Sequence, residues 1–319
     1  MQQVHKGSKL AGQQNLQTLL ENFMNELWPL TKTGKLASYI PALEKAKEDA
    51  FGACLITLDG TVAKYGDYLE PYTMQSISKV FSFICCLLDS TREQLYERIS
   101  LEPSPNSFNA IADLETHATR KPLNPMINAG AIAVLELVSG KTATEKYERI
   151  RGLVRLLCGN DNLDYNDEVY RSEQETGDRN RSLAYYMRSN GIIEGNVDSL
   201  LEVYFKLCAI DVTCEDLAKA AAVLANNGVG ADGKALIPPN IVNATRTVMA
   251  LCGMYNESGR YAVQVGIPSK SGVGGGIVGV VPNVMGISIF SPALNEHGSS
   301  VCGYALMKRL SDCLGLSVF

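Results

Sequence analysis

The strand signals of this chain stand at its two ends, and helical signals fill the middle. Residues 52–68 contain two apolar runs that flank Asp59-Gly60, a pair typical of the tight turn of a β-hairpin. Residues 276–290 contain two more runs, with Pro282-Asn283 between them as the turn. Strands need a shared apolar core, so we expect the two ends of the chain to meet in one antiparallel sheet.

The segment between the two groups of strands predicts a mainly helical part. We therefore expect a mixed α/β (α+β) fold, in which residues 1–75 and 254–319 form a discontinuous sheet domain flanked by the terminal helices. Residues 76–253 form an inserted all-helical domain, with the active site in the cleft between the two parts.

Local patterns predict individual elements. Apolar spacing predicts helix over much of residues 10–48, and a last helix from about 300 to 313. Ser172-x-x-Glu175 has the form of a capping box that opens a helix through Tyr185 and Tyr186, and Thr213-x-x-Asp216 predicts another that ends at Asn226-Asn227-Gly228. The stretch Tyr261-Ala-Val-Gln-Val reads as a strand.

Composition excludes several classes of protein. Charged residues are 20% of the chain and the net charge is −5 without a basic block, so we expect no nucleic acid and no membrane surface as partner. No apolar run reaches the roughly 20 residues of a membrane span, and the first residues lack a secretory signal. Nine cysteines without a Cys-x-x-Cys pair indicate reduced thiols in a cytoplasmic protein, with no metal site.

Gln75-Ser76-Ile77-Ser78-Lys79 is followed by a long apolar run that predicts a buried helix. Residues three apart share a helix face, so Lys79 lies one turn below the Ser76 hydroxyl. A buried lysine has a lowered pKa and can activate a serine nucleophile, and helix amides around Ser76 can hold an oxyanion. The motif alone favours the simpler interpretation, an N-cap serine with a solvated lysine.

Histidine is scarce, which limits the alternatives for a catalytic base. The three histidines, His5, His117 and His297, show no metal-type spacing, and only His117 stands where a catalytic imidazole is plausible. The supply of imidazole therefore favours lysine or tyrosine as the base.

The glycine-rich stretch near the C-terminus has two interpretations. Gly274-x-Gly276-x-x-Gly279 matches the dinucleotide fingerprint formally, but a strand follows it where the fingerprint needs a helix. We therefore interpret it as a strand edge that lets a substrate approach backbone amides. Lys270-Ser271-Gly272 precedes it, and the combination of Ser-x-x-Lys with a late Lys-Ser/Thr-Gly resembles the serine β-lactamases and penicillin-binding proteins.

Five motifs extend that resemblance. They occur in the order Gln75-Ser76-x-x-Lys79, Asn124-Pro-Met-Ile-Asn-Ala-Gly-Ala131, Ser172-Glu-x-Glu-x-Gly-Asp-Arg-Asn180, Cys252-Gly-Met-Tyr255 and Lys270-Ser-Gly-Val-x-Gly-Gly276. The set resembles the serine-dependent glutaminases, which share the β-lactamase-like fold, from about Tyr39 to near the C-terminus.

The resemblance implies hydrolysis of the side-chain amide of L-glutamine to L-glutamate and ammonia, without a metal or organic cofactor, by a homo-oligomer (dimer or tetramer). It implies Ser76 as nucleophile, Lys79 as base and Tyr255 as proton relay, with the amides of Ser76 and Val273 as oxyanion hole. The remaining residues would bind the substrate: Asn128, Glu173, Asn180, Tyr204, Tyr39 and Gln75.

Two other functions remain open at this stage. One is a penicillin-interacting hydrolase, against which Glu173 argues because it suits a free ammonium group. The other is a non-catalytic amino-acid sensor, against which the presence of both Ser76 and Lys79 argues. A cysteine amidotransferase is excluded, because no cysteine stands in a Gly-x-Cys-x-Gly elbow with a suitable histidine.

Overall fold

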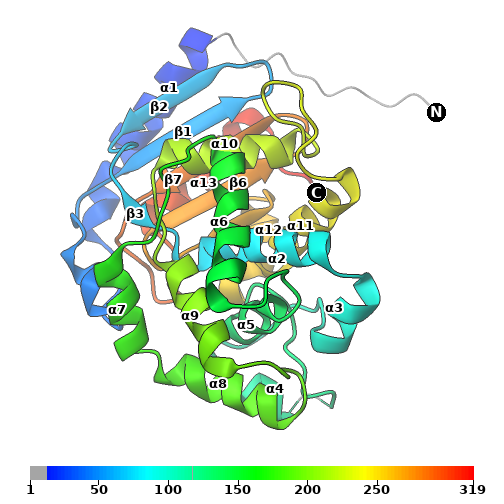
Figure 1. Ribbon diagram of the computed structural model, residues 1–319. Helices are drawn as coiled ribbons and strands as arrows, with labels where there is room; N and C mark the ends of the chain where they lie inside the picture. The colour runs from blue at the N-terminus through cyan, green and yellow to red at the C-terminus, as the bar shows by residue number, and fades with distance from the viewer. Residues whose placement is uncertain (1–12, 117) are drawn as a thin grey trace.

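The computed structural model describes residues 13–116 and 118–319. A five-stranded antiparallel sheet with the order β2-β1-β7-β6-β5 forms its upper half (Figure 1). Strand β1 pairs directly with β7, with Ala53 opposite Ile289, so the two ends of the chain meet as the sequence predicts. A short second sheet joins β3 to β4.

The strands are β1 (Gly52–Thr57), β2 (Val62–Gly66), β3 (Tyr72–Thr73), β4 (Asp211–Val212), β5 (Ser269–Ser271), β6 (Gly276–Val281) and β7 (Met285–Phe290). The α-helices are α1 (Gln13–Leu27), α2 (Ser78–Asp89), α3 (Arg92–Arg98), α4 (Ala112–Thr116), α5 (Asn128–Leu135), α6 (Ala143–Cys158), α7 (Asp167–Glu175), α8 (Asp178–Ser189), α9 (Val197–Cys208), α10 (Cys214–Ala225), α11 (Pro239–Cys252), α12 (Ser258–Gln264) and α13 (Val301–Leu314). Short 3₁₀ helices are η1 (Trp28–Lys32), η2 (Pro41–Lys45), η3 (Gln75–Ile77) and η4 (Tyr255–Glu257).

The sheet is buried on both faces, and the alternation of side chains along β1 divides the apolar core. Ala53 and Leu55 pack in one cluster with residues of α1 and α13, while Cys54 belongs to the cluster on the opposite face. Successive side chains of a strand point to opposite faces, which is why a nearly continuous apolar run suits this position.

Helix α10 covers the second face of the sheet, where it packs across β7, β1 and β6. A Cβ atom at Gly286 of β7 would lie 2.2 Å from the backbone nitrogen of Ala222, so this close approach requires glycine. The capping box of Thr213 and Asp216 opens α10 as predicted, and the helix ends at Ala225. Thus one helix from the middle of the chain packs on the sheet, and the division at residues 75 and 253 stays a prediction.

Helices α2, α5, α6, α8 and α9 pack against one another in the lower half of Figure 1. Helix α2 lies among α5, α6 and α11, and nine of its residues, Ser78 to Cys86, are buried. A helix with neighbours on most sides needs apolar residues all round, which accounts for the unbroken run that follows Ser76.

Two predicted elements are wrong. Ser172 opens no helix, because α7 begins earlier, where the Asn166 side chain accepts a hydrogen bond from the Val169 amide. The Ser172 hydroxyl instead accepts from the Ala42 amide, and a new helix, α8, begins at Asp178. The second error is residues 261–265, where helix α12 replaces the predicted strand. Tyr261 and Val265, four residues apart, are both buried, whereas Val263 between them is 89% exposed, so burial follows the helical period and not the alternation of a strand.

The N-terminal region is helical only in part. Helix α1 continues into η1, after which residues 33–40 form no helix before η2.

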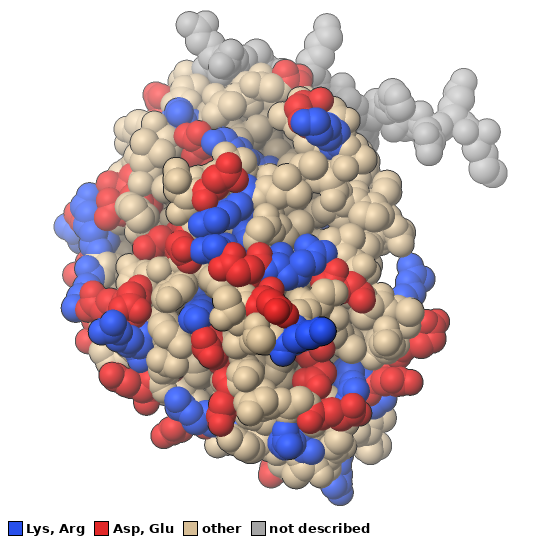
Figure 2. Space-filling view, viewed as in Figure 1, with Lys and Arg blue, Asp and Glu red and all other residues tan. Residues whose placement is uncertain are grey.

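Positive and negative side chains are interspersed over the face shown in Figure 2. Within the two described ranges, no helix is long and apolar enough to cross a membrane.

Candidate active site

Ser76 and Lys79 face each other at the start of α2. Ser76 lies in η3, the 3₁₀ turn that leads into α2, and Lys79 follows three residues later. The Lys79 Nζ atom is 2.8 Å from Ser76 Oγ and 2.7 Å from Asn128 Oδ1. Both side chains are buried, with Lys79 only 1% exposed, so the solvated lysine of the alternative interpretation is excluded.

Burial lowers the pKa of Lys79 from 10.5 to about 8, against the opposing charge of Glu173. The ammonium loses its hydration in a site whose walls include the rings of Phe108 and Tyr204, whose centroids are 5.9 and 6.0 Å from Nζ. A substantial share of Lys79 is therefore the free amine near neutral pH, the form that can accept a proton from a serine hydroxyl.

Asn128 is the first residue of α5 and lies beside Lys79. A Cβ atom at Gly130 would lie 1.9 Å from the carbonyl oxygen of Asn124, so only glycine allows the tight turn that enters this helix. Asn128 Nδ2 donates to Asn180 Oδ1 of α8 at 2.9 Å. Hydrogen bonds therefore connect Ser76, Lys79, Asn128 and Asn180 in one chain, with one N–H and one lone pair of the Asn128 amide left for a ligand.

Glu173 is a buried carboxyl group in the last turn of α7, although its sequence context had indicated the first turn of a helix. Burial raises its pKa to about 7, while a hydrogen bond from Gln75 and the charge on Lys79 oppose the increase. A buried carboxyl group with a pKa of about 7 is only half ionised at neutral pH. A cation on a ligand would favour its ionised form and pair with it.

Tyr255 is the first residue of η4, and its side chain also contacts Ser76. Its hydroxyl donates to the Ser271 carbonyl oxygen at 3.1 Å. Burial raises the pKa of Tyr255 to about 12, and hydrogen bonds with Ser76 and Ser271 oppose the increase. The Phe108 ring lies 4.7 Å from the Tyr255 ring, centroid to centroid, and fixes that face of the site.

The backbone on either side of the nucleophile is strained. Gln75 and Tyr255 have positive φ angles of 49° and 55°, although neither is glycine. Such conformations persist only where the surrounding structure determines them, and they cluster at functional sites. Gln75 precedes Ser76 in the chain, and the Tyr255 hydroxyl forms a hydrogen bond with Ser76.

The stretch around Val273 runs against the backbone that carries Ser76. Cβ atoms at Gly272 and Gly274 would lie 2.6 and 2.7 Å from the carbonyl oxygens of Met74 and Thr73. The two glycines therefore bring the Val273 amide beside η3, and the Val273 side chain packs in one cluster with Tyr255. The arrangement fits the predicted strand edge that leaves backbone amides accessible to a substrate.

Tyr39 lies at the rim of the site. The residue is 53% exposed as a whole, while burial of its hydroxyl end, with Glu173 and Tyr255 nearby, raises its pKa. Tyr39, Phe108 and Val273 line one depression of about 600 Å³, which neither Ser76 nor Lys79 lines. Phe108 was missed in the sequence, where an aromatic residue within the polar, irregular stretch 99–125 was the available signal.

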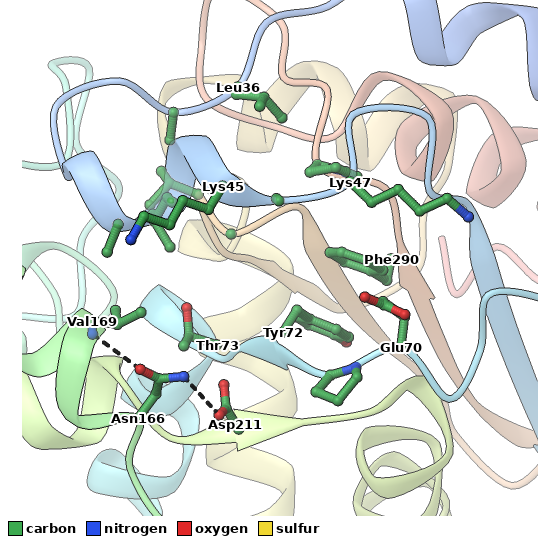
Figure 3. A pocket seen from close by; sticks show the side chains of 18 of the residues that line it. Leu36, Lys45, Lys47, Glu70, Tyr72, Thr73, Asn166, Val169, Asp211 and Phe290 are labelled. Atoms are coloured by element: carbon green, nitrogen blue, oxygen red, sulfur yellow. Dashed lines mark hydrogen bonds between the residues drawn. The ribbon is translucent and has the colours of Figure 1, made fainter.

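A separate pocket of about 240 Å³ has Tyr72, Thr73 and Phe290 among its lining residues (Figure 3). Its two lysines are already paired, Lys45 with Glu168 and Lys47 with Asp67. Neither Ser76 nor Lys79 lines it. It therefore offers none of the nucleophilic chemistry of the site above.

Among the described residues, no group of three or more histidine, cysteine or acidic side chains is arranged to hold a metal ion. His5 and His117 lie outside the described residues. A catalytic role of the His117 imidazole therefore stays a prediction from the sequence.

The chain is similar to known proteins over nearly all of its length. The glutaminase family profile matches residues 34–319. A glutaminase of Clostridium tetani is 48% identical over 95% of this chain and 100% of its own length. The crystal structure of a probable glutaminase of Bacillus subtilis, 37% identical, superposes with a TM-score of 0.90 over 96% of this chain and 98% of its own.

A third relative carries a covalently bound ligand. It is a covalent complex between a Bacillus subtilis glutaminase and 5-oxo-L-norleucine, formed with 6-diazo-5-oxo-L-norleucine. It has a TM-score of 0.88 at 37% identity, over 96% of this chain and all of its own.

The antiparallel sheet with its covering helices is the β-lactamase-like fold that these bacterial structures share. Within that fold the chain belongs to the glutaminase family, and it is an enzyme of the amidohydrolase class. The predictions of fold and family are confirmed.

Proposed function

We propose that the enzyme hydrolyses L-glutamine to L-glutamate and ammonia through a covalent ester on Ser76. The observation that carries the proposal is the contact of 2.8 Å between Lys79 Nζ and Ser76 Oγ in a buried site, with the lysine pKa lowered to about 8. An amine that is partly neutral at pH 7 to 8 is a competent base for a serine hydroxyl.

In the acylation step the Ser76 oxygen attacks the side-chain amide carbon, and Lys79 takes the hydroxyl proton. The amides of Ser76 and Val273 donate to the developing oxyanion, which lowers the barrier by several kcal/mol. The carbon–nitrogen bond then breaks, and the proton held by Lys79 passes through the Tyr255 hydroxyl to the nitrogen, which leaves as ammonia. Water cleaves the resulting ester by the same route in reverse, which releases L-glutamate and restores Ser76.

The amino-acid end of the substrate lies toward the helical part of the chain. The Glu173 carboxylate pairs with the substrate ammonium, while Asn128, Asn180 and Tyr204 donate to its carboxylate, and Tyr39 and Gln75 complete the pocket. A glutaminase of Bacillus subtilis forms a covalent complex with a glutamine-like diazo ketone, which supports an attacking nucleophile in this family.

The test is ammonia release from L-glutamine, L-asparagine and D-glutamine by the wild type and by Ser76→Ala. We expect release from L-glutamine that falls at least 10³-fold in the variant, with no metal or cofactor added. Activity that survives Ser76→Ala would refute the mechanism. An inactive wild type whose melting temperature rises with L-glutamine would replace the enzyme with a sensor.

Two further expectations accompany the proposal, a homo-oligomer (dimer or tetramer) and a cytoplasmic location. Light scattering at several protein concentrations tests the first, and cell fractionation tests the second.

A further inference from the structure

Lys270 is a second buried lysine that the proposed reaction does not use. It lies on β5, it is 0% exposed, and no acidic side chain of the described residues forms an ion pair with it. Its Nζ atom donates to the carbonyl oxygens of Gly253 at 2.9 Å and Ser271 at 2.7 Å. Burying an amine costs several kcal/mol unless its donors are matched, so a residue kept only for packing would be better replaced by methionine.

Both acceptors of Lys270 belong to the immediate surroundings of Tyr255. Gly253 stands two residues before it, and Ser271 supplies the carbonyl oxygen to which the Tyr255 hydroxyl donates. The Lys270 nitrogen also lies 4.2 Å from the centroid of the Tyr255 ring. Lys270 therefore contacts the Tyr255 ring and donates to two carbonyl oxygens, one in the turn before Tyr255 and one on β5.

The backbone at this point needs such a constraint. Tyr255 adopts a positive φ of 55°, an unfavourable conformation for a residue with a Cβ atom. The Ser271 amide donates to Gly253 at 3.2 Å, so the turn is already joined to β5, and Lys270 adds two donors to the same junction. Without them the strained turn is free to relax and to move the hydroxyl away from Ser76.

We propose that Lys270 is a positioning residue, which holds the Tyr255 hydroxyl on the line between Lys79 and the departing nitrogen of the substrate. The inference rests on the proposed function, because it assigns Lys270 a role only through the proton relay of Tyr255.

The charge of Lys270 is consistent with this role. Burial and the nearby charge of Lys79 lower the pKa of Lys270 well below its usual value. A neutral amine has two N–H groups, and two carbonyl oxygens accept them. Lys270 can thus hold the turn without placing a second full positive charge beside the catalytic base.

The experiment is a double-mutant cycle on L-glutamine turnover with Lys270→Met, Tyr255→Phe and the double variant. Lys270→Met keeps the apolar stem and removes the donors. We expect kcat to fall about 100-fold with KM within threefold, because the amino-acid end of the substrate binds elsewhere. In the Tyr255→Phe background the same change should lower kcat less than threefold, because the hydroxyl that it positions is gone.

Ser269→Ala is the matched control on the same strand. Its hydroxyl bonds to Tyr261, outside the site, and its loss should leave kcat within threefold. Lys270→Arg retains donors and should recover part of the activity lost in Lys270→Met. If Lys270→Met does not fold, as judged by circular dichroism, Lys270→Leu, which also removes the donors, enters the cycle with the same criteria.

The inference is overturned if Lys270→Met lowers kcat equally in both backgrounds, if the loss appears in KM, or if it stays below threefold. These outcomes leave the proposed function intact as long as the wild type turns over L-glutamine and Ser76→Ala does not. An inactive wild type, in contrast, overturns both.

Discussion

The pH dependence of kcat/KM follows from two buried groups whose pKa values converge on neutrality. Burial brings the pKa of Lys79 down to about 8 and that of Glu173 up to about 7. At pH 7.5 a lysine with this pKa is about one quarter neutral, whereas one at 10.5 is about one part in a thousand neutral. Burial therefore enriches the active base about two-hundredfold.

Both groups act in the same direction. The substrate ammonium needs ionised Glu173, which forms as the pH rises through about 7, and the nucleophile needs neutral Lys79, which forms through about 8. We expect log kcat/KM to rise with a slope near two below pH 7 and near one between 7 and 8, and then to level off. Initial rates between pH 5.5 and 9, at substrate concentrations well below KM, measure this profile.

Glu173→Gln separates the two groups. It should remove the lower step and lower kcat/KM by on the order of 100-fold, because the ammonium loses a charged partner. The Glu173 carboxylate also raises the pKa of Lys79, so the remaining step should move to lower pH in the variant. A wild-type profile that is flat between pH 6 and 9, or a step that moves upward in Glu173→Gln, would refute the assignment.

Three predictions concern stability, and thermal melting measures each. Lys146→Met should destabilise the protein by about 1–3 kcal/mol, because the Lys146 ammonium donates to three carbonyls at the end of α5, whereas exposed Lys141→Met should have little effect. Gly253→Ala should prevent correct folding of the turn, because a Cβ atom there would lie 1.8 Å from the Ser269 carbonyl oxygen. Gly152→Ala should stabilise by about 0.5–1 kcal/mol, because its Cβ atom would meet nothing within 4 Å in the middle of α6. A stable Gly253→Ala or a destabilised Gly152→Ala would contradict these arguments.

The sheet and the paired ends of the chain were predictable because their signals are local. Asp59-Gly60 predicts a tight turn from the two residues alone, and β1 pairs with β2 across it. Pro282-Asn283 marks the turn between β6 and β7 in the same way. Apolar runs do not report which helices will surround them, so the packing of α10 on the sheet could not be predicted from its own sequence.

The two wrong elements show where local patterns are ambiguous. Ser172-x-x-Glu175 has the residue types of a capping box, but Asn166 caps the helix six residues earlier, so Ser172 lies inside a helix that has already begun. In residues 261–265, the apolar residues at both ends are compatible with a strand and with a helix. Their packing against the rest of the protein determines which of the two forms.

The candidate site divides in the same way. Ser76 in η3 and Lys79 in α2 stand three residues apart where one helical turn leads into the next, so their contact followed from spacing alone. The approach of Asn128, Glu173 and Tyr255 depends on three separate elements, so the residues alone could not predict it, and only the family motifs named them. The role of Phe108 depends on the path of an irregular loop, which no periodicity encodes.

The central claim is that Ser76 is the nucleophile that Lys79 activates. The most direct measurement is intact mass and peptide mapping after incubation with 6-diazo-5-oxo-L-norleucine, in the wild type, Ser76→Ala and Lys79→Met. The account predicts one adduct on Ser76 in the wild type, none in Ser76→Ala, and strongly slowed labelling in Lys79→Met. An adduct on another residue, or labelling that persists in Ser76→Ala, would contradict it.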